Sequence, residues 1–138
     1  MYVLDTNVLS EIMKESPDPA VAEWLSACPA DAMFTTAICH TEILYGVRRM
    51  PDGQKRYRLA AAVQAMFAQE FAGRVLPFDE AAASVYADLR IARERAGRPL
   101  MVEDGMIAAI TKVVGANIVT RDKAGFDGCG VPVINPWE

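Results

Sequence analysis

The amino-acid sequence predicts an α/β fold, a three-layer α/β/α sandwich with a central, mostly parallel five-stranded sheet. Short apolar runs alternate with longer helical patterns, as in strands joined by helical crossovers. The first run, residues 2–4, has no polar alternation, as expected of a strand buried on both faces. A chain of 138 residues, 52% of them hydrophobic, can bury a core and is expected to form one domain over residues 1–138.

The first segment is expected to form a strand and two helices. The strand at residues 2–4 leads to a short helix over residues 8–14. Asp18-Pro19 then begins a second helix that ends near Ala27, because an acidic cap followed by proline favours a helix start.

The next segment is expected to form a strand and a pair of helices. Residues 33–35 are the strand, and Thr35-Thr36 caps a helix over residues 37–50. The turn Pro51-Asp52-Gly53 separates this helix from a long alanine-rich helix over residues 54–71.

The last segment is expected to hold the other three strands. Asp79 caps one of its two helices, and a glycine follows the end of each. The expected elements are a strand at 74–78, helices at 80–96 and 101–114, and strands at 117–120 and 131–134.

Composition excludes several classes of function. The net charge of -4 gives no general basic surface for coating nucleic acid. Cys28, Cys39 and Cys129 lack zinc-ligand spacing, and His40 is the only histidine. No apolar run is long enough for a membrane span, and Asp5 interrupts any signal-peptide core. A soluble cytoplasmic protein with no membrane contact is predicted.

Two acidic residues follow apolar strands. Asp5 comes directly after the first strand and Asp122 comes soon after the fourth, so both belong to the carboxyl edge of the sheet. Ligands of open α/β sheets bind at that edge. If the two strands are neighbours, the two carboxylates form a negative pair; Asp5 could alternatively act only as a helix cap.

Two further acids lie on predicted helices without basic partners. Neither Glu42 nor Asp104 has Lys or Arg three or four residues away, where a solvated ion pair would place one. Both could be buried hydrogen-bonded acids, or they could meet a cation. Together with Asp5 and Asp122 they equal the whole net charge of -4. Four gathered carboxylates favour a hard divalent cation such as Mg²⁺ or Mn²⁺.

Six motifs, in order along the whole chain, resemble those of the PIN-domain family, and within it the VapC-type toxins of the FitB-like branch. They are VLDTNVLSE from Val3, TAICHTEILYGV from Thr36, LPFDE from Leu76, EDGMIAA from Glu103, VTRD from Val119, and the closing NPWE.

The resemblance implies a Mg²⁺- or Mn²⁺-dependent endoribonuclease, the toxin of a type II toxin-antitoxin pair, inhibited by a cognate antitoxin. DNA would be contacted only through the antitoxin. The catalytic and metal-binding quartet falls on Asp5, Glu42, Asp104 and Asp122. The residues expected to support it by hydrogen bonding or from the rim are Thr6, Asn7, Thr120 and Glu103, and Glu103 could exchange roles with Asp104.

The chemistry expected of such a site is hydrolysis of a phosphodiester by activated water, leaving a 5′-phosphate and a 3′-hydroxyl. Substrate phosphates need positive partners, and the candidates near the edge are Arg121, Lys123, Arg48 and Arg49. Each could equally be a solvated surface charge.

Other functions fit the sequence less well. A phosphohydrolase of the haloacid-dehalogenase kind would carry a second Asp where Asn7 stands, and a receiver domain would need paired acids after the first strand. A binding module that acts mainly with its antitoxin in a DNA-bound autoregulatory complex stays open as an alternative. The apolar stripes that include Met66, Phe67 and Leu89 serve either the core or a homodimer face.

Overall fold

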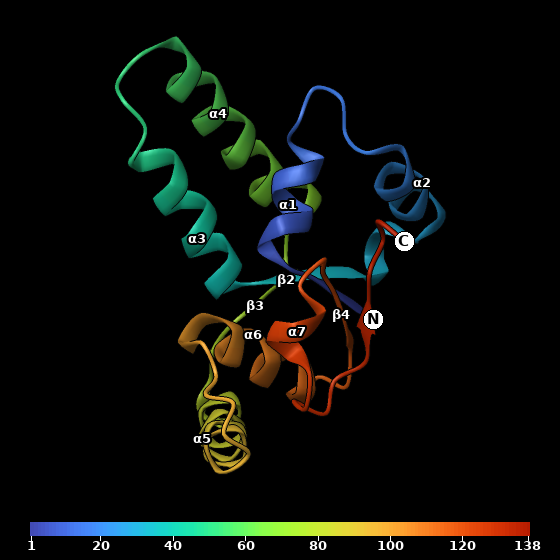
Figure 1. Ribbon diagram of the computed structural model, residues 1–138. Coiled ribbons are helices and arrows are strands. Elements are labelled where there is room, and N and C mark those ends of the chain that lie inside the picture. The colour runs from blue at the N-terminus through green and yellow to red at the C-terminus, as the bar shows by residue number, and fades with distance from the viewer.

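The computed structural model describes residues 1–138 and has a five-stranded sheet between two layers of helices (Figure 1). All four strand pairs are parallel, which confirms the predicted three-layer sandwich. The elements in chain order are β1 (Tyr2–Leu4), α1 (Thr6–Ile12), α2 (Pro19–Ala27), η1 (Ala30–Ala32), β2 (Met33–Thr36), α3 (Ala37–Arg48), α4 (Gln54–Ala65), η2 (Met66–Glu70), β3 (Val75–Leu76), α5 (Glu80–Arg95), α6 (Val102–Val113), β4 (Asn117–Val119), α7 (Lys123–Phe126) and β5 (Val133–Ile134).

The strand order β3-β2-β1-β4-β5 creates a switch point between β1 and β4. The connection after β1 enters α1 on one side of the sheet, whereas the connection after β4 enters α7 on the other side (Figure 1). At such a point the two loops separate and leave a crevice at the carboxyl edge, where ligands of open α/β sheets bind. Asp5 follows β1 and Asp122 follows β4, so the assumed adjacency of their strands is confirmed.

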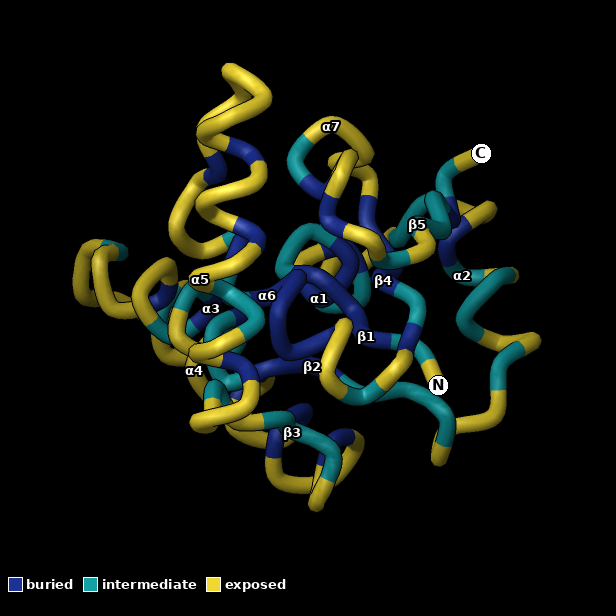
Figure 2. The backbone as a smooth tube through the Cα atoms, turned by 90° about the horizontal axis from the view of Figure 1, so that it is seen from below, coloured by how far each residue is buried: buried dark blue, intermediate teal, exposed yellow.

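The inner strands form the centre of the core. Figure 2 shows β1, β2 and β4 running through the buried middle of the molecule, while α5 is exposed along much of its length. Val3, Leu4 and Ile118 are fully buried, as expected of strands covered on both faces. Met66, Phe67 and Leu89 are also core residues. None of the helices is long and apolar enough to cross a membrane.

Helices α5 and α6 pack closely because one residue of α6 has no side chain. A Cβ atom on Gly105 would lie 2.6 Å from side-chain atoms of both Leu100 and Tyr86. Such distances lie far inside van der Waals contact, so any larger residue would push the helices apart. The preceding residue is Asp104, and this packing therefore fixes the position of an acid predicted to be functional.

Several element boundaries differ from the sequence prediction. The first helix begins at Thr6 rather than residue 8, because Asp5 caps it directly. The prediction of one long helix over residues 54–71 is wrong at its end, since α4 ends at Ala65 and a π-helical turn follows. The edge strands β3 and β5 are shorter than predicted; Pro77 and Pro132 have no N–H for pairing.

Candidate active site

Asp5 follows β1 at the switch point of the sheet and is 6% exposed. Its backbone N–H continues the pairing of β1 with β4 by donating to the Val119 carbonyl at 3.0 Å. Its Oδ1 accepts a 2.8 Å hydrogen bond from the Thr6 backbone N–H, as in a helix cap. The cap interpretation of Asp5 is thus correct, but it accounts for only one side of the carboxylate.

Thr120 connects the ends of the two central strands. Its hydroxyl donates to Asp5 Oδ2 at 2.8 Å and accepts from Asn7 Nδ2 and from the Asp122 backbone N–H, both at 3.0 Å. The Asn7 Oδ1 in turn accepts from the Arg121 N–H at 3.3 Å. Asn7 and Thr120, both predicted to support the quartet, therefore form one hydrogen-bonded bridge between the loops that carry Asp5 and Asp122.

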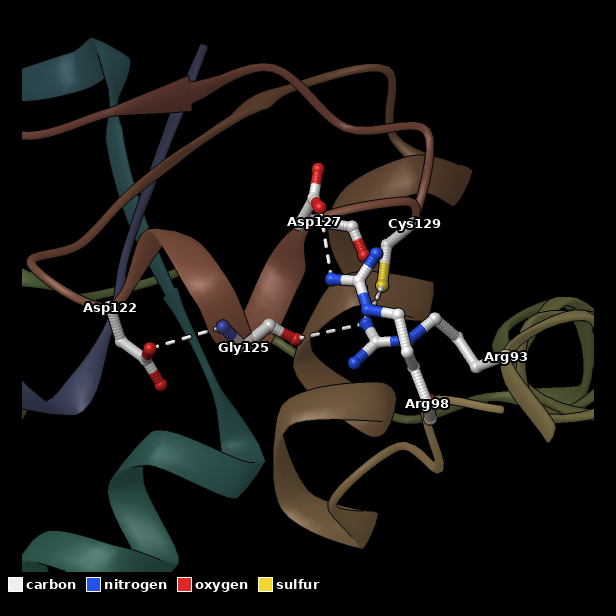
Figure 3. Close-up of polar contacts among 6 residues, drawn as sticks. All are labelled: Arg93, Arg98, Asp122, Gly125, Asp127 and Cys129. Atoms are coloured by element: carbon white, nitrogen blue, oxygen red, sulfur yellow. Dashed lines mark hydrogen bonds and ion pairs between the residues drawn. The ribbon is translucent and has the colours of Figure 1, made fainter. Parts of the chain in front are cut away.

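Asp122 caps α7 and faces Asp104 across a glycine. Its Oδ1 accepts from the Gly125 N–H at 3.0 Å (Figure 3). A Cβ atom on Gly125 would lie 2.5 Å from Asp122 Oδ2 and 2.8 Å from Asp104 Oδ2. Both carboxylates thus approach a single point that only a residue without a side chain leaves free.

The acids from four elements interact electrostatically. Burial raises the pKa of Asp5, and repulsion from Asp122 adds to the rise. Burial, followed by repulsion from Asp5 and Asp122, raises the pKa of Asp104 to about 6. Burial also raises the pKa of Glu42, and Asp5, Asp104 and the exposed Glu103 repel its charge, while the neighbouring Thr6 hydroxyl opposes the rise. The predicted quartet therefore shares one negative region, with Glu103 at its rim.

The donors at this region are oxygen atoms, the type that Mg²⁺ and Mn²⁺ prefer. Thr6 Oγ1 is buried there and makes no hydrogen bond of acceptable geometry, so one more oxygen is free to accept a ligand. No three His, Cys, Asp or Glu side chains of the chain are arranged closely enough to hold a metal ion among them. The residues fit a hard cation in donor type and charge; the acids converge without forming a closed coordination shell.

The basic residues predicted to bind phosphate are scattered. The Arg121 guanidinium lies 4.0 Å from the centre of the Trp137 ring, and that of Arg49 lies 5.5 Å from the centre of the Tyr45 ring. Lys123 is exposed at the start of α7. Arg48 lines a separate hollow of about 610 Å³ between α3 and α4, which contains none of the acids. The structure brings none of the four cations into a hydrogen bond with the acidic region.

His40 packs against the core residue Phe67 and makes no hydrogen bond with the acids. Its ring stacks on Phe67 with the ring centres 3.8 Å apart. Burial and the nearby Arg48 lower the pKa of His40, which favours the neutral imidazole.

Two residues near the acids were missed by the sequence analysis. Cys39 Sγ is buried 3.9 Å from Asp5 Oδ1, and burial and the Asp5 charge raise its pKa to about 11, so it is a neutral weak donor. Arg93 is buried behind the loop that carries Asp122. The burial of Arg93 could have been predicted from the sequence. It follows the core residue Leu89 by four positions and therefore lies on the same apolar helix face.

The fold and the acids define an α/β/α domain with acidic residues gathered near the switch point of its sheet. The family model for the PIN domain matches residues 2–128, and the chain belongs to the PIN-domain family.

Individual relatives match over the full chain. The chain is 39% identical over 138 residues to the VapC ribonuclease Y4jK of Sinorhizobium fredii, covering 100% of this chain and 99% of that protein. It is 36% identical, with the same coverage, to the toxin FitB of Neisseria gonorrhoeae. In structure it is similar to a chain of FitAB bound to an IR36 DNA fragment, with a TM-score of 0.93, 36% identity, and coverage of 100% of this chain and 96% of that one. The resemblance drawn from the six motifs is confirmed.

Proposed function

We propose that the chain is a single PIN domain that acts as the toxin of a type II toxin-antitoxin pair, a Mg²⁺- or Mn²⁺-dependent endoribonuclease. One observation carries the proposal: acids from four elements of the fold lie near enough to repel one another around the switch point of the sheet, and the pKa of each of Asp5, Glu42 and Asp104 is raised. Such clustering of perturbed acids is typical of functional sites. The similarity to a VapC ribonuclease supports the same reaction class.

Asp5, Glu42, Asp104 and Asp122 are the residues that would hold the cation, directly or through water, and Thr6 could supply a further oxygen. A bound divalent cation would neutralise these charges and act as a Lewis acid toward a phosphate oxygen. Repulsion among the carboxylates is the reason the cation would bind: unit charges about 4 Å apart repel by roughly 1 to 4 kcal/mol in water-like to surface-like surroundings.

Other groups of the chain would orient a carboxylate, accept a proton and bind the substrate phosphate. Thr120 and the Thr6 N–H each hold one oxygen of the Asp5 carboxylate, so both hydrogen bonds fix its orientation. Asp104, whose pKa is raised to about 6 by burial and by the neighbouring carboxylates, is suited to take a proton from the attacking water. Lys123, exposed next to Asp122 at the start of α7, is the candidate to meet a substrate phosphate, since Arg121 is stacked on Trp137.

A cognate antitoxin is the proposed protein partner, and DNA would be reached only through it. The similarity to FitAB bound to a DNA fragment supports this assembly. The same similarity favours a second candidate function, a binding module that works mainly within a DNA-bound autoregulatory complex. The two functions can be distinguished by their need for the carboxylates. Cleavage requires them intact, whereas a binding module does not.

The test is cleavage of labelled structured RNA with Mn²⁺ or Mg²⁺, beside samples with EDTA and the variant Asp5→Asn. The matched control is Asp18→Asn, which makes the same change at another helix cap, where the side chain accepts from Ala20. We expect cleavage by the wild type and by Asp18→Asn, and none with EDTA or with Asp5→Asn. Equal cleavage by Asp5→Asn would overturn the nuclease proposal, and binding of the antitoxin without cleavage by any variant would favour the binding module.

A further inference from the structure

Arg93 is a buried cation that makes no ion pair with a carboxylate, although its charge opposes the rise in the pKa of Asp104. It lies on α5 and is 8% exposed, yet none of the ion pairs of the chain includes it. Burial of an unpaired charge is costly, and an apolar side chain of similar length would fill this helix face at lower cost. The presence of arginine at this position therefore requires an explanation other than packing.

The guanidinium is satisfied by backbone carbonyls of two loops. Its Nε donates to the Arg98 carbonyl at 2.8 Å, and its Nη1 donates to the Asp127 carbonyl at 2.8 Å. The Gly125 carbonyl lies 3.5 Å from the same Nη1, at the limit of a hydrogen bond (Figure 3). Five N–H groups in a rigid planar fork allow arginine, but not lysine, to hold several acceptors at once.

Gly125 connects the Arg93 guanidinium to the acidic residue Asp122. Its carbonyl faces Arg93, and its N–H donates to Asp122 Oδ1 at 3.0 Å. Figure 3 shows the two contacts on opposite sides of the Gly125 backbone. A shift of this residue would also change the narrow space that it leaves between Asp122 and Asp104. The position of the Asp122 carboxylate thus depends on a residue of another helix.

We propose that Arg93 is a positioning residue: its guanidinium holds the turn from Gly125 to Asp127 and so sets the Asp122 carboxylate against Asp104. The inference rests on the proposed function in its Mn²⁺ affinity and activity readouts, whereas the Gly125 amide shift tests the geometry alone. Outer residues that orient metal ligands typically contribute 10- to 100-fold in metal affinity or activity.

Arg98 offers a matched control on the same turn. Its Nη2 pairs with the Asp127 carboxylate at 2.9 Å, but its side chain is 49% exposed, and exposed pairs contribute little. Arg98→Gln therefore removes a guanidinium that touches the turn from outside without removing the buried fork.

The test compares Arg93→Met, Arg93→Lys and Arg98→Gln with the wild type in three measurements. Amide NMR of the metal-free protein reports the Gly125 N–H bond, calorimetry reports Mn²⁺ affinity, and RNA cleavage reports kcat and KM separately. Both Arg93 variants should lose the hydrogen-bonded shift of the Gly125 amide and bind Mn²⁺ about 10-fold more weakly. Their kcat should fall while KM stays unchanged, and Arg98→Gln should match the wild type.

Arg93→Lys keeps the positive charge but lacks the planar guanidinium. This variant therefore still tests the proposal if Arg93→Met does not fold. A folded Arg93→Lys protein with wild-type Gly125 shift and wild-type Mn²⁺ affinity would overturn the proposal. Absence of cleavage by the wild type would count against the nuclease function alone, because the amide shift and Mn²⁺ affinity still decide the role of Arg93.

Discussion

Asp5 and Asp122 follow neighbouring strands and both cap helices, yet they are held in different ways. Asp5 is 6% exposed and is fixed on both oxygens, by the Thr6 N–H and by the Thr120 hydroxyl. Asp122 is exposed, and its carboxylate is fixed by the Gly125 N–H. The first acid is oriented by the start of α1 and by the residue that follows β4, whereas the second is oriented by the short helix α7.

This difference indicates which parts of the site should tolerate substitution. A carboxylate set by strand pairing moves only if the core moves, because packed interiors are stiff. A carboxylate held by a short helix such as α7 moves with whatever holds that helix. We therefore expect substitutions on the Asp5 side to abolish function and those on the Asp122 side to weaken it by degrees.

The largest effect is expected from Asp5→Asn. An amide keeps the shape of the side chain but removes the charge that a cation requires. Metal-ion catalysis supplies several kcal/mol, which corresponds to a loss of about 1000-fold in kcat. Measured cleavage rates that fell less for Asp5→Asn than for Asp122→Asn would reverse the comparison.

Gly125→Ala should have the next largest effect, about 10- to 100-fold in activity, because the added methyl would displace Asp122 and Asp104 from each other. Gly46→Ala is the matched control, since it adds the same methyl to a helix where nothing lies within 4 Å. Steady-state cleavage rates of the two variants measure the difference. Equal rates would show that the spacing of Asp122 and Asp104 has no importance.

Thr120→Val tests the bridge between the two sides, and we expect about a 10-fold weaker Mn²⁺ affinity. The variant removes the hydroxyl that joins Asp5, Asn7 and the Asp122 N–H. Thr111→Val is the control, because Thr111 is also fully buried but bonds only within α6, to the Ile107 carbonyl. Calorimetric titration that gave both variants the same affinity would argue against the bridge.

The smallest effect is on stability. The pKa of Asp104 is about 6 in the folded protein against 3.8 for the ordinary group, so the folded state binds more protons between these values. Stability of the metal-free protein should therefore fall as pH rises from about 4 to above 6. Asp104→Asn should remove this loss and stabilise the metal-free protein by about 1 to 2 kcal/mol at neutral pH, after allowance for solvent screening.

Thermal melting of wild type and Asp104→Asn checks this prediction. The melting temperatures should be similar near about pH 4 and separate by a few degrees above about pH 6, with the variant higher. A variant that melts clearly lower at neutral pH would mean that Asp104 is stabilised by its surroundings rather than repelled.

The sequence predicted the fold and the acidic residues because both depend on local patterns. Buried strands are continuous apolar runs, and Asp5 stands where the first run ends. Glu42 and Asp104 could be singled out because no basic residue lies at helical spacing from either.

What the sequence did not predict depends on contacts between distant segments. Arg93 and Gly125 are 32 residues apart and meet only because α5 packs beside the loop after β4. Arg121 was a candidate either for phosphate binding or for a solvated surface position, and instead its guanidinium lies over the ring of Trp137. Neither pairing follows from periodicity or propensity, since both arise from tertiary packing.

The central claim is that Asp5, Glu42, Asp104 and Asp122 share one cation. Titration of isotope-labelled protein with Mn²⁺, followed by amide NMR, tests it most directly, because a bound paramagnetic ion broadens the signals of its nearest residues. We expect the amides of all four acids to broaden together, at substoichiometric Mn²⁺, and none to broaden in Asp5→Asn. Broadening centred on other acids, or unchanged by Asp5→Asn, would contradict the shared site.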